Sequence, residues 1–171
     1  MTGTVSRPLA LQTRLLLISF AALAPLSLDI YLPALTEMSS ELRAAPEEAT
    51  ATLSVFFLGM AFGQLVIGPW SDRVGRRVPI LLGLACMTLG AVICLLSRDI
   101  FSLLAGRLLQ AIAGAAVTVA GRASVRDLLD ERESARFLST IATVNSLAPI
   151  LAPSLGAVIL LFGGWRAGFG F

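Results

Sequence analysis

The chain has 171 residues, of which 56% are hydrophobic and only 14% charged, and its mean hydropathy is +0.85. These values exclude an ordinary soluble domain and predict a protein that lies largely in lipid. The basic residues are all arginine, and the net charge is only +2, so the charge gives no indication of a nucleic-acid partner.

Five apolar stretches follow one another along the chain, each long enough to cross a bilayer as an α-helix. They cover about residues 15–35, 50–69, 78–96, 100–121 and 137–162, and a sixth stretch, 167–171, begins at the end of the chain. The connectors between them are short and polar, which is typical of a helical bundle and not of a barrel of alternating strands. We therefore predict an all-α membrane protein with a tail of residues 1–14 and a transmembrane bundle of residues 15–171. Five of its helices would be complete.

The arginines outside the spans are distributed unevenly between the two faces of this bundle. One face holds Arg7, Arg14, Arg73, Arg76, Arg77, Arg122, Arg126, Arg132 and Arg136, and the other holds Arg43, Arg98 and Arg166. Because connectors rich in arginine stay in the cytoplasm, we predict that the N-terminal tail is cytoplasmic. A cleaved signal peptide is the alternative, but Pro25 directly after the small residues 22–24 would be expected to block cleavage.

The sequence lacks the side chains that most enzymes use for nucleophilic or metal chemistry. It contains no histidine, and its two cysteines, Cys86 and Cys94, both lie in the third span. A nucleophilic serine or cysteine would have no imidazole base, and there is no metal site of the usual kind. The thiols are most simply small buried apolar groups. We therefore expect neither an enzyme nor a bound cofactor.

Two charged residues, Asp29 and Arg107, fall inside the predicted spans. A charge in hydrocarbon costs roughly 2.5 to 3.5 kcal/mol, so each is expected to face a cavity or a partner. At 1.5 Å per residue both lie roughly 10 Å below the same face, where they could share one aqueous cleft. Gln110 and Gly114 follow Arg107 at helical spacing, which favours a polar, closely packed seam. The alternatives are an Asp29 that reaches lipid headgroups and an Arg107 that snorkels.

Four segments carry a resemblance to the major facilitator superfamily. Residues 68–77, GPWSDRVGRR, match the complete G-x-x-x-D-R-x-G-R-R signature between the second and third helices of that family. RLLQA at 107–111 resembles its fourth-helix R-x-x-Q-G motif, and residues 148–157 resemble its fifth-helix antiporter motif, with alanine at positions where glycine is usual. LDIYLPAL at 28–35 is similar to the first helix of the bicyclomycin-resistance (Bcr/CflA) drug exporters, and the Arg126-Asp127 pair also fits them.

The resemblance implies the N-terminal six-helix half of a transporter, with a second half that completes the cleft. It implies a proton and substrate site of Asp29, Tyr31, Arg107 and Gln110. Asp29 would bind the proton or cation, and Arg107 would lower the proton affinity of that carboxylate when close and raise it when withdrawn.

A gating loop on the cytoplasmic face is also implied, formed by Gly68, Asp72, Arg73, Gly75, Arg76, Arg77 and Arg126. Its glycines would permit close packing or unusual backbone, and Asp72 would accept hydrogen bonds from arginines such as Arg126. Arg76 and Arg77 have an alternative use as anchors to anionic lipid. In the fifth span, Pro149 and Pro153 would bend the helix, while Ala152 and Gly156 would form a tightly packed face.

We accordingly predict proton-coupled efflux of drugs or other small molecules across the bacterial inner membrane, with the proton gradient as energy source. The expected partners are the drug or metabolite, protons, the bilayer and the missing six-helix half. Because the sequence stops within the predicted sixth helix, we expect a fragment, a truncated reading frame or one half of a split transporter. A sugar or metabolite carrier, weakened by the antiporter-like fifth span, and a nontransporting membrane protein are the alternatives.

Overall fold

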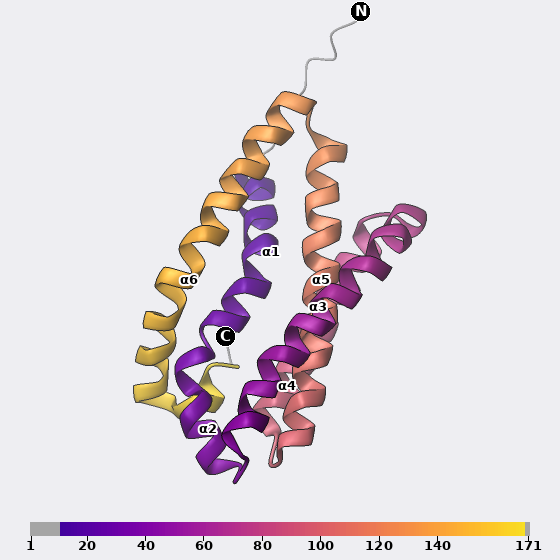
Figure 1. The fold of residues 1–171 in the computed structure, drawn as a ribbon. Helices are drawn as coiled ribbons and strands as arrows, with labels where there is room; N and C mark the ends of the chain where they lie inside the picture. The colour runs from indigo at the N-terminus through magenta and orange to yellow at the C-terminus, as the bar shows by residue number, and fades with distance from the viewer. Residues whose placement is uncertain (1–10, 170–171) are drawn as a thin grey trace, which may run out of the picture.

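The computed structural model describes residues 11–169, which form helices joined by short connectors (Figure 1). The elements are α1 (Leu11–Asp29), the 3-10 helix η1 (Leu32–Ala34), α2 (Leu35–Glu41), α3 (Pro46–Val74), α4 (Arg77–Leu96), α5 (Ile100–Leu128) and α6 (Glu131–Ala167). Arg7 and most of the predicted N-terminal tail lie outside the described residues, as do residues 170–171.

Within residues 11–169, five helical stretches are long and apolar enough to cross a membrane, which confirms the predicted class. The first consists of α1, η1 and α2 together, and the others are α3, α4, α5 and α6. Three of them, α3, α5 and α6, continue beyond the apolar stretches seen in the sequence. Their polar ends stay helical because glutamate and arginine are good helix formers, and caps satisfy the terminal N–H groups.

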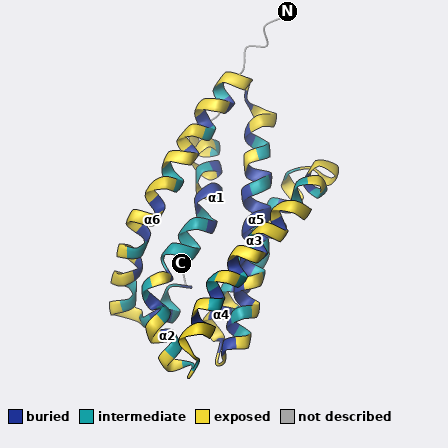
Figure 2. Cartoon of the chain, viewed as in Figure 1, coloured by how far each residue is buried: buried dark blue, intermediate teal, exposed yellow. Residues whose placement is uncertain are grey.

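Helix α5 lies at the centre of the bundle. In its most apolar part 61% of the residues are buried, against 17 to 28% in the other spans, and Figure 2 shows α3 and α6 exposed along much of their length. Small residues allow its neighbours to approach. A Cβ added to Gly63 of α3 would lie 2.7 Å from the Ala115 Cβ, and one added to Gly90 of α4 would lie 2.9 Å from the Gly106 carbonyl oxygen. Such close backbone contacts hold helices together where lipid removes the hydrophobic driving force.

Helix α6 packs along α1 on the other side of the bundle (Figure 1). Near one end the contact is apolar, formed by Leu17 and Ala21 of α1 with Phe137 and Ile141 of α6. Near the other end it is closer still, because a Cβ on Gly156 would overlap the carbonyl oxygen of Ile30. No other residue type fits that position without moving one of the helices.

The connectors alternate between the two ends of the bundle (Figure 1). Residues 42–45 and 97–99 lie at one end with the break in α6, and this end is called the α2 end below. The start of α1, the α3–α4 connector and the α5–α6 connector lie toward the opposite end, called the arginine-rich end. An aspartate caps a helix at each end: Asp99 Oδ1 accepts from Ser102 N at 2.8 Å at the α2 end, and Asp130 Oδ1 accepts from Glu133 N at 2.8 Å at the other.

Two breaks differ from the sequence prediction. Helix α3 runs to Val74, so most of residues 68–77 is helical and only Gly75 and Arg76 separate α3 from α4. In α6, Gly164 has φ +67° and ψ −179°, which interrupts the helix and turns the following residues back toward the bundle. The stretch predicted to begin a sixth helix at residue 167 therefore starts on the last residue of α6, directly after this turn.

Candidate functional site

Arg107 of α5 is fully buried at 0% exposure and is enclosed by aromatic rings. Its guanidinium carbon lies 4.5 Å from the centre of the Tyr31 ring, 4.5 Å from that of Phe56 and 5.6 Å from that of Phe169. The π faces of aromatic rings attract a cation within about 6 Å. These rings come from the α1–η1 connection, from α3 and from the residues after α6, so the guanidinium lies where four parts of the chain meet. We call Arg107 with these three rings the arginine cage.

Hydrogen bonds hold only one side of this guanidinium. Arg107 Nη1 donates to the Ser27 carbonyl oxygen at 3.2 Å and to Gln110 Oε1 at 3.3 Å. Its Nε and Nη2 are buried and have no hydrogen-bond partner in the part of the chain that the structure describes. Among residues 11–169 no carboxylate pairs with it. A buried charge that lacks a counter-ion is costly, so the cage rings and two acceptors only partly compensate for the lost water.

Asp29 and Arg107, which were predicted to share a cleft, make no ion pair with each other within residues 11–169. Asp29 ends α1, is half-buried, and makes no hydrogen bond or ion pair within the described part of the chain. The reason is helical rotation: the Ser27 carbonyl faces Arg107, and a residue two positions later is turned by about 200°. The two predicted charges therefore lie on the same helix pair without touching.

The structure brings Tyr31 and Gln110, two other residues of the predicted site, to Arg107. Tyr31 is 2% exposed, and its hydroxyl is 2.8 Å from Thr52 Oγ1, which fixes the ring against the guanidinium. Gln110 lies one helical turn after Arg107 and is 4% exposed. Its Oε1 is also 3.7 Å from the thiol sulfur of Cys94, which is fully buried as expected for a small apolar group.

A cavity of about 520 Å³ lies beside the arginine cage, between α1 and α4. Its walls are mainly apolar, and none of its lining side chains is charged. Three residues of the arginine site also line it: Ser27, Gln110 and Phe169. Phe169 therefore contacts the cation on one side and the cavity on the other. A mostly apolar cavity with a few polar groups is the usual form of a small-molecule site.

Arg76 connects helices at the arginine-rich end. Its Nε donates to Asp127 Oδ2 at 2.8 Å, and its Nη1 donates to Ser71 Oγ at 3.1 Å and to the carboxylate of Asp72. The Asp127 hydrogen bond, followed by that of Asp72, raises the pKa of Arg76 above its ordinary value. Arg76 thus links α3 to α5, because it binds Ser71 and Asp72 of α3 and Asp127 of α5. The predicted contact between Asp72 and Arg126 is absent, because Arg126 is exposed and has no ion pair within residues 11–169.

The remaining residues of the predicted gating loop differ in their surroundings. Gly75 has φ +85°, a backbone conformation that favours glycine, as expected for a tight turn. Gly68 lies inside α3, and a Cβ there would meet nothing within 4 Å, so no close contact explains this glycine. Arg73 and Arg77 are exposed, which is compatible with their use as anchors at the membrane surface.

In α6 the small residues of the antiporter-like motif face α1, whereas the prolines do not. Ala152 is fully buried, and Gly156 makes the contact with Ile30 described above. Pro149 is exposed and Pro153 is half-buried. The packed face was predicted from the spacing, and the prolines lie beside it rather than within it.

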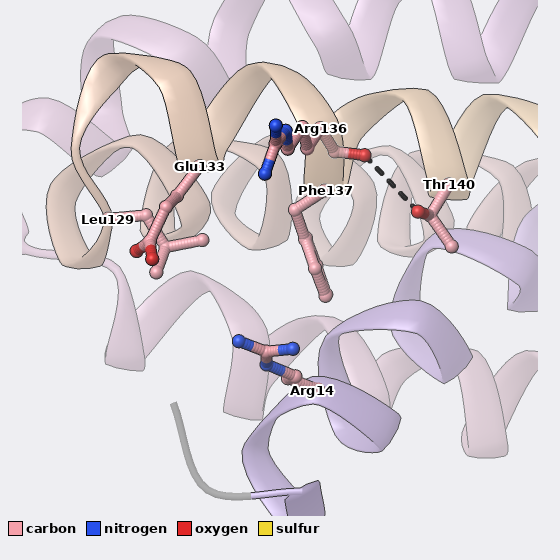
Figure 3. A pocket seen from close by; sticks show the side chains of 6 residues that line it. All are labelled: Arg14, Leu129, Glu133, Arg136, Phe137 and Thr140. Carbon is pink, nitrogen blue, oxygen red and sulfur yellow. Dashed lines mark hydrogen bonds between the residues drawn. The ribbon is translucent and has the colours of Figure 1, made fainter. Parts of the chain in front are cut away.

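A smaller cavity of about 210 Å³ lies at the arginine-rich end between the beginnings of α1 and α6. It is lined by Arg14, Leu129, Glu133, Arg136, Phe137 and Thr140. Figure 3 shows the Arg14 side chain reaching from α1 toward the Phe137 ring of α6. The cavity thus combines two guanidinium groups and one carboxylate with the apolar side chains of Leu129 and Phe137.

Sequence reasoning missed several residues of the site. Phe56 and Phe169 carried no local signal, because an aromatic residue in an apolar stretch is usually ordinary core. Glu41, Trp165 and Arg166 were also missed, and they contact one another at the α2 end. A usable signal existed for two of them: Glu41 and Arg166 have opposite charges and lie in connectors assigned to the same face.

The fold defines a multi-pass membrane protein, and comparison with known proteins gives its family. The chain belongs to the major facilitator superfamily, which it matches over residues 17–171. It is thus a member of a transporter family and not an enzyme.

Individual relatives match most of this chain. It is 38% identical over 151 residues to the uncharacterized MFS-type transporter YdgK of Bacillus subtilis, covering 87% of this chain and 38% of the relative. It is 39% identical over 147 residues to a bicyclomycin resistance protein homolog of Haemophilus influenzae, covering 86% of this chain and 37% of the relative. It is 35% identical over 160 residues to the multidrug resistance protein MdtL of Escherichia coli, covering 92% of this chain and 41% of the relative. The chain spans about two fifths of the length of these relatives.

Proposed function

We propose that this chain takes part in proton-coupled efflux of drug-like small molecules across the bacterial inner membrane, with its N-terminus in the cytoplasm. The substrate class is supported by relatives that are named for bicyclomycin and multidrug resistance and that match most of this chain. The structural observation that carries the proposal is the fully buried Arg107 without a counter-ion. An intramembrane charge of this kind costs stability and is retained where transport needs it.

The proposed mechanism is alternating access with Asp29 as the proton site. In this conformation Asp29 and Arg107 are apart, and the arginine cage holds the cation. A rotation of α1 relative to α5 that brings the carboxylate to the guanidinium would favour the ionised carboxylate and release its proton. Separation would favour proton uptake. Coupling is therefore a change in distance between two charges on helices that pack against each other.

The cleft for the transported molecule is proposed to need further helices besides those described. Transporters of this kind use repeated helical units, with the site at the interface between repeats. The positive end formed by the arginine-rich connectors supports the orientation with Arg76 and Asp127 on the cytoplasmic side.

Transport by the complete natural reading frame, in everted membrane vesicles from a strain without its own drug pumps, tests this proposal. We expect proton-driven efflux of at least one lipophilic drug, strongly reduced by Arg107→Ala and by Asp29→Asn. Arg98→Ala, an exposed arginine at the α2 end, is the matched control and should leave efflux unchanged. Unchanged efflux in Arg107→Ala would remove Arg107 from the mechanism.

The same vesicles separate the alternatives. A carrier for sugars or metabolites would move those solutes across the vesicle membrane and would transport none of a panel of drugs. A nontransporting protein would show neither activity although it reaches the membrane. The uncharged apolar lining of the 520 Å³ cavity favours drug-like molecules over sugars, since sugar sites need many hydrogen-bonding groups.

A further inference from the structure

We infer that Glu41 is a positioning residue: through Trp165 and Arg166 it holds Phe169 against the Arg107 guanidinium and closes the arginine cage at the α2 end. This inference goes beyond the proposed function, because it depends on the contacts of the described residues and not on what is transported.

Glu41 binds two side chains that lie more than a hundred residues later in the chain. One carboxylate oxygen, Oε2, accepts from Trp165 Nε1 at 2.5 Å. The other, Oε1, accepts from Arg166 and forms an ion pair with it. Arg166 Nη2 also donates to the Ser97 carbonyl oxygen at 2.9 Å, and its guanidinium carbon lies 4.3 Å from the Trp165 ring centre. The ends of α2, α4 and α6 are thereby tied together.

From this surface group a row of aromatic contacts leads to the buried cation. Trp165 is 1% exposed and meets the Phe169 ring edge-on at 6.1 Å between ring centres. The Phe169 ring in turn lies 5.4 Å from the Tyr31 ring and 5.6 Å from the Arg107 guanidinium carbon. An exposed carboxylate thus fixes one of the three rings of the cage through a single intervening side chain.

Residues 165–169 are attached to the rest of α6 by a break at Gly164. The backbone there has φ +67° and ψ −179°, which is accessible mainly to glycine, so the segment does not continue the long helix. Hydrogen bonds from Gly168 N to Trp165 O and from Phe169 N to Arg166 O keep it as one compact turn. The position of this turn therefore depends on the contacts of its side chains rather than on continuation of the helix.

Movement of this turn would change access to the cage. Phe169 is one of the residues between the 520 Å³ cavity and Arg107, since it lines the cavity and lies 5.6 Å from the guanidinium carbon. Trp165 and Phe169 also belong to the same buried cluster as Cys94. Release of this turn is expected to uncover the Cys94 thiol, because both belong to that cluster. The native thiol of Cys94 is therefore a direct reporter of the closed cage.

An exposed ion pair alone would contribute little to holding this turn, because solvent screens the two charges. Glu41 differs in accepting a second hydrogen bond from the indole of a buried tryptophan. Removal of the carboxylate leaves that indole N–H without its acceptor, and a buried donor without a partner is costly. Both contacts act on the same turn, so both losses favour its release.

The test is the rate at which N-ethylmaleimide labels Cys94 in membranes that contain the natural full-length protein with Cys94 as its only cysteine. We expect slow labelling in this background and roughly fivefold faster labelling after Glu41→Ala, because opening becomes less costly. Glu41→Gln keeps an acceptor for Trp165 and should give an intermediate rate. Glu47→Ala, an exposed glutamate in the first turn of α3, is the control and should change nothing.

Two further variants show whether Glu41 acts by positioning Phe169 or by stabilising the whole α2 end. Phe169→Ala should speed labelling by itself, and adding Glu41→Ala to it should give little further increase, since Glu41 acts through that ring. Fully additive effects, or a Glu41→Ala rate equal to the control, would overturn the inference. Labelling requires neither substrate nor gradient, so the expected rates without any efflux would contradict only the proposed function. Normal efflux with unchanged labelling would contradict only the role of Glu41.

Discussion

The Arg107 guanidinium lies over the Tyr31 ring at 4.5 Å, and two of its three nitrogens have no hydrogen-bond partner. A desolvated cation–π contact contributes about 2 kcal/mol. The transfer of an arginine from water into a buried site costs several kcal/mol even after relaxation. The cage therefore offsets a large part of the cost without forming a fully satisfied site. An unsatisfied charge at this position is typical of a group that changes partners.

Arg107→Met is expected to stabilise the protein and abolish efflux. Methionine follows the arginine stem closely in volume, buries no charge and leaves no unpaired donors. We expect the stability to rise by on the order of 1 kcal/mol, as for other buried charges replaced by apolar residues. Thermal unfolding in detergent, together with vesicle efflux, measures both effects.

Arg107→Ala serves as the comparison. It also removes the charge, but it leaves a cavity whose cost cancels the gain in stability. A Met variant that loses stability along with transport would show that Arg107 has a structural role instead.

Gly156→Ala should destabilise the α1–α6 contact. The new Cβ would overlap the Ile30 carbonyl oxygen, which is backbone and can yield only if α1 or α6 shifts. Forced shifts of this kind cost roughly 1 to 3 kcal/mol, which corresponds to a melting temperature lower by several degrees. The measurement is thermal unfolding monitored by circular dichroism.

Gly68→Ala is the matched control for Gly156→Ala. Gly68 lies inside α3, and the added Cβ meets nothing within 4 Å. Because alanine is the better helix former by about 1 kcal/mol, Gly68→Ala should be neutral or stabilising. Equal losses in the two variants would argue against the close approach of α6 to α1 at Ile30.

The contrast between these glycines shows what could be predicted from the sequence. The spans, their number and the burial of Arg107 and Gln110 within them follow from local composition, because lipid requires long apolar helices and penalises charge. The close face at Ala152 and Gly156 follows from small residues at helical spacing. Gly68 fits the family signature, but its surroundings show no steric reason for glycine.

The partners of the charged residues could not be predicted in this way. Asp29 and Arg107 lie at similar depth, but depth does not determine the direction in which a side chain points. The family resemblance implies a contact of Asp72 with arginines such as Arg126, whereas in the structure Asp72 pairs with Arg76, which also binds Asp127. The contact of Glu41 with Trp165 joins residues 124 positions apart and needs the turn at Gly164. Such pairs depend on the packing of whole helices.

Arg76→Ala should loosen the link between α3 and α5 at the arginine-rich end. Arg76 has a side chain only 26% exposed and is shared by Asp72 and Asp127, whereas Arg126 is exposed and unpaired within the described residues. Arg76→Ala is expected to cost roughly 0.2 to 1 kcal/mol, as for partly exposed pairs, and to slow efflux. Arg126→Ala should do neither. Vesicle efflux and thermal unfolding at low and high salt distinguish the two variants. Only the stability that the Arg76 ion pairs contribute should fall as salt is added, because salt screens their charges. The opposite order would restore Arg126 as the gating residue.

The cap at the start of α5 should give a pH-dependent contribution to stability. The Ser102 backbone N–H donates to the Asp99 carboxylate and lowers the pKa of that carboxyl below its ordinary value of 3.8. Because the folded state binds the proton more weakly than the unfolded state, the stabilisation is complete above the unfolded pKa. It is lost as the pH falls through the lower folded pKa.

Melting temperatures of the wild type, Asp99→Ala and Asp99→Asn between about pH 6 and pH 2.5 test this sign, since this range includes the ordinary pKa of an aspartate. The wild type should melt above Asp99→Ala at the upper end of this range, and the difference should shrink as the acid protonates the carboxylate. Asparagine is as good a cap and does not titrate, so Asp99→Asn should keep its advantage over Asp99→Ala at every pH. Acid effects on the other carboxylates cancel in these differences. A gap between wild type and Asp99→Ala that is constant over the range would show that the charged form of Asp99 does not cap α5.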